Sequence, residues 1–206
     1  MKPTLKFLPV LGLALTACVD LTQRPLEKQR YLLAAPRPQS RPAPAKGEIL
    51  LLRPFAVAPA FAGKGFVHRL DAERYASDPE HELFVGPGDA VTMVAERWLE
   101  YAGLFRAVVR PGSPLQPTLR LEGDVRALYL DRTDPAAPAA IAHLSVLLLR
   151  EDGEGRTLLG QHEYRADVQA EAATAPEFVR ALDRALAAVM ASLEKDLATW
   201  LAAAKR

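Results

Sequence analysis

Three consecutive segments in the second half of the chain alternate apolar and polar residues, and they limit the possible folds more than any other feature. They begin at Thr118, Ala139 and Arg156. A period of two places one row of side chains on each face of a β-strand. The apolar rows of the first and third segments are Leu119, Leu121, Val125 and Ala127, and Leu158, Tyr164, Ala166 and Val168. One polar face per strand predicts an antiparallel sheet covered on one side, with the more apolar middle segment at its centre.

Two segments with helical periodicity can supply that cover. They span residues 87–102 and 176–203. In both, apolar residues recur at steps of three and four and form one stripe along a helix. The second helix is long enough for its last turns, with Trp200 and Leu201, to extend beyond the sheet and offer an exposed contact. The pattern predicts an α+β fold, a two-layer sandwich of a mainly antiparallel sheet with two helices packed on one face.

Shorter strands are predicted in the first half of the chain. Residues 48–58 form a buried strand candidate that Pro54 interrupts. Residues 65–70 and 73–76 indicate a hairpin or two short strands. Residues 31–33 break a polar stretch and indicate a short strand that docks on the domain.

The N-terminus carries the sharpest chemical signal. Residues 1–17 combine a positively charged start with an apolar run that is too short to span a membrane, which is typical of a secretory signal peptide. The four residues Leu15-Thr16-Ala17-Cys18 resemble a bacterial lipobox, in which a signal peptidase cuts before a cysteine whose sulfur carries a diacylglycerol. Cys18 is the only cysteine of the chain. We predict Cys18 as the lipidation site, whose acyl chains (palmitate and its like) hold the protein on a membrane; the alternative is an incidental cysteine in an ordinary signal peptide.

This signal divides the chain into three parts. Residues 1–17 are predicted as the lipoprotein signal peptide, 18–47 as the lipidated N-terminus with a Pro-rich linker, and 48–206 as the periplasmic domain. Within the linker, residues 34–47 are so rich in proline that we expect them not to pack and to act as a semi-rigid spacer.

The residues directly after the cysteine indicate to which membrane the lipoprotein is sorted. By resemblance to the sorting rules of bacterial lipoproteins, an aspartate directly after the cysteine retains the protein in the inner membrane. Val19 occupies that position here, which favours the periplasmic face of the outer membrane. Asp20, one residue later, leaves the inner membrane as an alternative.

Composition and motifs argue against most chemistries. The formal net charge of +1 offers no basic face for nucleic acid, and one cysteine cannot form an internal disulfide. The sequence has neither the serine elbow of a hydrolase nor a phosphate-binding loop. We therefore predict a protein that is not an enzyme, with no catalytic residues, no cofactor and no metal.

Two groups of polar residues are candidate sites. The stretch SDPEHE, residues 77–82, holds three carboxylates and a histidine but lacks a regular ligand spacing, so we interpret it as a solvated loop rather than a metal site. His143 and His162 become cross-strand neighbours if the hairpin register allows it, and a structural pair is then the simpler interpretation.

The middle of the chain resembles a known family. The resembling elements are the strand that ends at Pro59, residues 63–69, Tyr75, and the residues 98–105 that include Trp-Leu and Gly-Leu-Phe. Together with the lipobox and a Tyr-Leu pair at residues 31–32, they resemble the ABC-type transport auxiliary lipoprotein family, the PqiC-like lipoproteins. The resemblance implies an outer-membrane adaptor that works with an ABC transporter and MCE-domain proteins in lipid transport between membranes. It implies no catalytic residue.

Other functions stay open beside this one. The chain could be a scaffold of the cell envelope that is not tied to transport, or a lipoprotein that itself binds a phospholipid. Edge strands of the predicted sheet need cover, which makes a homo-oligomer a further expectation.

Overall fold

One long strand, β7, organises the sheet. The computed structural model describes residues 27–44, 46–152 and 155–205. Within them the elements are, in chain order, β1 (Gln29–Tyr31), β2 (Ile49–Leu52), β3 (Ala56–Val57), the 3-10 turn η1 (Pro59–Phe61), β4 (Gly65–Arg69), β5 (Tyr75–Leu83), α1 (Pro87–Glu100), β6 (Ala107–Val109), β7 (Leu119–Asp131), β8 (Ala139–Asp152), β9 (Gly155–Gln169) and α2 (Ala175–Ala203). β7 pairs with β2, β3, β4 and β8, so strands from both halves of the chain meet on it.

The α+β class is confirmed, and the sheet is mixed. The pairs β7–β8, β8–β9 and β4–β5 are antiparallel, as the alternation predicts. The short strands β2, β3 and β4 run parallel to β7, β6 runs parallel to β2, and β1 runs parallel to β5. A parallel pair needs a crossover, and the chain between β2 and β7 includes α1.

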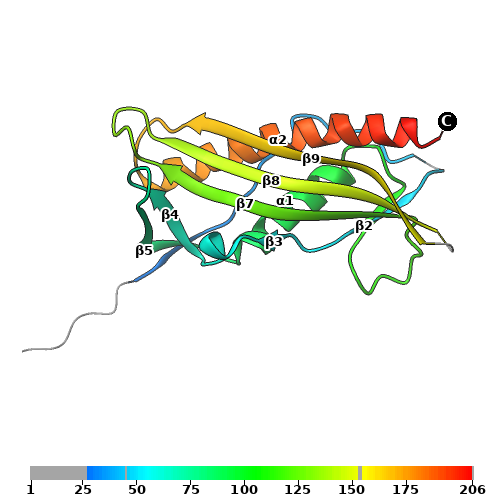
Figure 1. Ribbon diagram of the computed structural model, residues 1–206, viewed down its shortest axis with the longest axis horizontal. Coiled ribbons are helices and arrows are strands. Elements are labelled where there is room, and N and C mark those ends of the chain that lie inside the picture. Colours follow the sequence, from blue (N-terminus) through cyan, green and yellow to red (C-terminus); the bar gives the residue numbers. More distant parts are fainter. Residues whose placement is uncertain (1–26, 45, 153–154, 206) are drawn as a thin grey trace, which may run out of the picture.

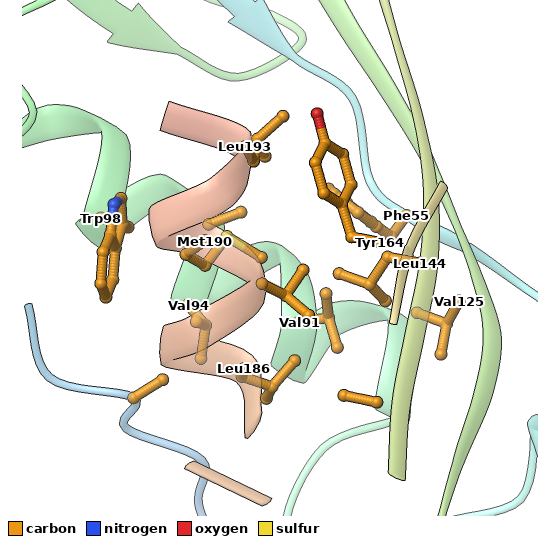
Figure 2. Close-up of a cluster of buried hydrophobic side chains, with 14 of the residues drawn as sticks. Phe55, Val91, Val94, Trp98, Val125, Leu144, Tyr164, Leu186, Met190 and Leu193 are labelled. Atoms are coloured by element: carbon orange, nitrogen blue, oxygen red, sulfur yellow. The ribbon is translucent and has the colours of Figure 1, made fainter. Parts of the chain in front are cut away.

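Both helices lie on one face of the sheet, as predicted (Figure 1). α2 packs along β8 and β9, while α1 packs on β7, β3 and β6. Figure 2 shows the core between them, where Met190 of α2, Val91 of α1 and Leu144 of β8 belong to one buried cluster. Among the described residues, no helix is both long enough and apolar enough to span a membrane.

Two β-bulges correct the predicted faces of the long strands. The register between β7 and β8 shifts between Val125 and Ala127, so Ala127 lies on the face away from the helices instead of beside Val125. The register between β8 and β9 shifts next to Leu158, which is exposed and not part of the apolar row. An extra residue on one strand inverts the alternation beyond it, and a strict period of two cannot foresee this.

The second face of the sheet carries a small apolar cluster of its own. Ala127, Tyr129 and Ile141 are buried there under Phe61 of η1. The rings of Phe61 and Tyr129 stack with centroids 5.8 Å apart, and Tyr75 meets Tyr129 edge-on at 5.6 Å. The sheet is therefore covered fully on one face and locally on the other.

The end of α2 does not extend beyond the sheet. Leu201 is buried, and Trp200 packs over Gly160 of β9 so closely that a methyl group at residue 160 would overlap the indole ring. The prediction of an exposed Trp200–Leu201 contact is wrong, because β9 is long enough to accompany the helix to its last turns.

Candidate functional site

The N-terminal strap, residues 33–41, crosses both helices. Hydrogen bonds and a largely buried ion pair join it to them, which makes it the candidate site among the described residues. Leu33 and Ala35 are buried in the core. The carboxylate of Asp183 on α2 accepts the backbone N–H groups of Ala34 and Ala35 at 2.8 and 3.1 Å. Ala35 has φ of 37°, a left-handed conformation that costs a non-glycine residue energy. These contacts hold the strap at its first turn against α2.

Glu194 of α2 joins the strap to both helices. It accepts hydrogen bonds from Arg37 Nε and Nη2, at 3.1 and 2.9 Å, and from Trp98 Nε1 of α1 at 2.9 Å. The side chains of Arg37 and Glu194 are only 10% and 12% exposed. The Arg37 guanidinium also lies 5.9 Å from the centre of the Trp98 ring. A bidentate, largely buried ion pair fixes geometry as well as charge.

The two carboxylates on α2 differ in electrostatics. Burial raises the pKa of Glu194, but the hydrogen bonds from Arg37 and Trp98 outweigh burial and leave the pKa below its ordinary value. Burial also raises the pKa of Asp183, where two backbone N–H groups oppose it only in part. Glu194 is thus a stably ionised anchor, whereas Asp183 holds the strap mainly as a hydrogen-bond acceptor.

The expectation that residues 34–47 cannot pack is wrong for the part of that stretch that the structure describes. The strap lies across the helices instead of projecting into solvent, held by the contacts of Ala34 and Arg37 with α2. The backbone N–H of Arg41 donates to the carbonyl of Tyr101 just after α1, at 2.8 Å, and continues the attachment. A short strand does dock here, but as β1 at Gln29–Tyr31, which shares only Tyr31 with the stretch 31–33 expected from the sequence.

A groove of about 420 Å³ opens beside the strap. Trp98, Leu104, Ala187 and Ala191 line its apolar part, and Arg37, Arg41, Glu194 and Lys195 line its polar part. Its volume falls in the range of small-molecule sites, roughly 300–1,000 Å³. An apolar wall next to cations suits an amphiphile or an apolar peptide segment better than a small polar substrate.

The SDPEHE stretch, read as a solvated loop, is part of β5 instead. Asp78 accepts the backbone N–H groups of Glu80 and His81, both at 2.9 Å, and contacts the rings of His68 and His81 at 3.2 and 3.0 Å. Within the described ranges, no three metal-ligating side chains are arranged to hold a metal ion. Asp78 therefore organises the bend of β5 around Pro79.

His143 and His162 are not cross-strand neighbours. The register pairs His143 with Arg165 and His162 with Val146. His143 instead contacts Glu163 at 3.2 Å. The expected histidine pair is wrong, because the sequence of a hairpin does not define its register through a bulge.

Acidification is expected to destabilise the domain through Asp78. Burial raises its pKa, but hydrogen bonds from Glu80, His81 and the two imidazoles outweigh burial and lower it to about 2 from 3.8. Because the pKa is lower in the folded state, this stability is complete above about pH 4 and is lost as the pH falls towards 2. Burial also lowers the pKa of His68 from its usual value of 6.5. Below that pH the unfolded state binds the proton more readily than the folded state, so His68 also reduces stability on acidification.

Urea unfolding at about pH 5 and pH 2.5 measures this loss, for which we expect Asp78 to account for about 1–2 kcal/mol. The matched variant Asp78→Asn should lose correspondingly less stability between the two pH values. An equal loss in both proteins would contradict the assignment to Asp78.

Cys18 lies outside the described residues, and its lipidation stays a prediction. The strap residue Arg37 and its α2 neighbours Asp183 and Glu194 were not predicted as a site. The one hint in the sequence is that these charged residues stand in proline-rich or apolar surroundings. Arg37 and Glu194 are 157 residues apart, so their pairing leaves no local sequence pattern.

Comparisons with known proteins place the chain in a family. Among curated proteins, none matches this sequence. The crystal structure of protein XCC0632 from Xanthomonas campestris is similar with a TM-score of 0.75 at 17% identity, over 86% of this chain and 99% of that one. The crystal structure of an uncharacterized protein has a TM-score of 0.65 at 17% identity, over 83% and 99% of the two chains. Residues 31–194 match the model of the family described as ABC-type transport auxiliary lipoprotein component. The chain, which matches from the end of β1 through most of α2, belongs to the ABC-type transport auxiliary lipoprotein family.

Proposed function

We propose that this protein is the lipid-anchored adaptor of an ABC transport system that moves phospholipid between the two membranes of the envelope. Cys18 carries the anchor in the periplasmic face of the outer membrane, and the domain docks an MCE-domain protein that works with the ABC transporter. Family membership supports the link to transport. The proposed role is structural and not enzymatic, and the strap site provides attachment in place of catalysis.

The observation that carries the proposal is how few residues separate Cys18 from a point that is fixed to the domain. Lys28 already contacts Glu82 of β5 at 2.8 Å, and Gln29 starts β1. Cys18 lies ten residues before Lys28, a stretch that spans at most about 35 Å when fully extended. A spacer that ran to residue 47 would reach roughly 100 Å. The domain is therefore held close to the membrane that carries the anchor, where it can receive a partner reaching across the periplasm.

Replacing the anchor tests the location. We expect Cys18→Ala to leave the domain folded, because the core cluster is built from residues 31–201, and to move the protein from the outer-membrane fraction to the soluble fraction almost completely. Membrane fractionation with immunodetection measures the shift. Val19→Asp, which keeps the cysteine, is the control for sorting and should stay membrane-bound. Retention of Cys18→Ala in the outer membrane would refute the anchor.

Photo-cross-linking in cells tests the partner. A photoreactive residue at Lys195, on the rim of the strap groove, should capture an MCE-domain protein, whereas one at Arg156, which is exposed and does not line the groove, serves as the control. Capture of envelope proteins unrelated to transport would favour the alternative of a scaffold.

The strap groove is the one observation that favours a second function, in which the domain itself binds phospholipid. Its apolar wall and neighbouring cations match one acyl chain and an anionic headgroup. Lipid extraction from the purified protein should then recover phospholipid, and Ala191→Trp, which fills the groove, should abolish recovery. Equal recovery from both proteins would assign the lipid to the anchor or to another surface.

A further inference from the structure

Two large apolar side chains stand side by side on the surface where the chain enters the fold. β1 and β5 are parallel, with Tyr31 opposite Leu83. The backbone N–H of Phe84 donates to the carbonyl of Tyr31 at 2.8 Å, which extends the pairing by one residue. Because Tyr31 and Leu83 pack inward, the alternation turns Leu32 and Phe84 outward, where they are 57% and 55% exposed.

Cations surround this pair. Lys28 and Arg30 contact Glu82 at 2.8 and 3.0 Å while about half of each side chain stays exposed. The Lys64 ammonium donates to the carbonyl of Phe84 at 3.3 Å. Lys28, Arg30, Leu32, Lys64 and Phe84 together form what we call the anchor-side patch. The carboxylates beside its cations are Glu82, which Lys28 and Arg30 contact, and the exposed Glu80 and Glu27, which are close to them along the two strands.

We propose that the anchor-side patch rests on the phospholipid bilayer, with Leu32 and Phe84 inserted among the headgroups and the cations beside lipid phosphates. This inference rests on the proposed function, since it takes Cys18 as the lipid anchor. The chain outside the described residues ends at this patch, and ten residues from Cys18 keep Lys28 within about 35 Å of the membrane. Apolar side chains with basic neighbours are the chemistry of interfacial membrane contact, and a second weak contact strengthens a lipid anchor.

A second copy of the chain fits the patch less well. A stable protein interface covers roughly 800 Å² per partner, with 20–30 residues a side. The patch offers two apolar side chains at the edge of a three-residue strand. A bilayer needs no matching shape and accepts a contact this small when an anchor holds the two together.

The single cysteine makes a direct test possible. The full lipidated chain with Phe84→Cys is labelled at the thiol with the fluorophore NBD and added to preformed vesicles of phosphatidylethanolamine and phosphatidylglycerol. Leu158→Cys is the matched control, because Leu158 is also 55% exposed. It lies on β9 near the hairpin, at the opposite end of the long axis from β1 (Figure 1). Dithionite reduction and quenching by nitroxide-labelled lipids report whether each label meets the bilayer.

We expect the label at residue 84 to be reduced several-fold more slowly than the label at residue 158 and to be quenched by the nitroxide lipids. Equal reduction rates would overturn the inference. Slow reduction without quenching would also overturn it, because protein and not lipid would then cover the patch. The number of labels tests the proposed function separately: an acylated Cys18 leaves one reactive thiol per chain, whereas two labels would show that Cys18 is free and that the anchor is absent.

Discussion

Glu194→Ala is expected to lower the free energy of unfolding by about 3 kcal/mol and to release the strap from the helices. The substitution removes the only carboxylate that hydrogen-bonds Arg37 among the described contacts, so a largely buried guanidinium loses its counter-charge. It also leaves the buried indole N–H of Trp98 without its acceptor. Removing one partner of a buried ion pair costs roughly 3–5 kcal/mol. Urea unfolding measures the loss, and hydrogen exchange should accelerate at the amides of Ala35 and Arg41, which are hydrogen-bonded in the folded strap.

Two further variants separate charge from packing. Glu194→Gln keeps the shape and one acceptor oxygen, so it should lose less stability than Glu194→Ala. Arg41 lies 3.6 Å from Glu194 but is 66% exposed, and Arg41→Ala should change stability by under about 0.5 kcal/mol. If Glu194→Ala unfolded like the parent protein, the other attachments would hold the strap, namely the burial of Leu33 and Ala35, the hydrogen bonds to Asp183 and the backbone bond of Arg41.

Periodicity predicted the parts of the fold that depend on local pattern. Both helices and the three long strands follow from steps of three, four or two along the sequence, and Gly103 ends the first helical segment with φ of 69°, as a glycine after a helix does. The fold class follows from these elements, since a one-sided sheet and two one-sided helices have to cover each other.

The β-bulges and the strap site could not be predicted from local sequence pattern, because both depend on pairing between distant residues. Arg126 and Leu159 lie where the register shifts, and only the partner strand reveals that they are extra residues. Arg37 lies in a proline-rich stretch that composition describes as a spacer, and its partner Glu194 is one of several charges on α2. Proline content predicts an extended backbone, but it does not predict whether a surface exists for that backbone to cross.

Phe178→Ala is expected to cost about 3–4 kcal/mol of stability and to loosen β1. Phe178, in the first turns of α2, is buried, and its ring meets Phe66 edge-on at 5.1 Å. Phe66 in turn contacts the ring of Tyr31 at 5.3 Å, so one row of rings connects α2 through β4 to β1. Truncating a buried phenylalanine to alanine costs roughly 3–5 kcal/mol, because the transfer free energy is lost and a cavity remains.

Phe84 supplies the matched control for this truncation. Phe84→Ala removes the same atoms from an exposed position and should change stability by no more than about 0.5 kcal/mol. In Phe178→Ala, hydrogen exchange at the Phe84 amide, which donates to Tyr31, should accelerate more than exchange in the centre of β8, because β1 loses the ring that supports Tyr31. Equal acceleration at both places would mean that the domain opens as one unit. Unchanged exchange at Phe84 would mean that β5 alone holds β1, and that the link from α2 to the anchor-side patch does not run through these rings.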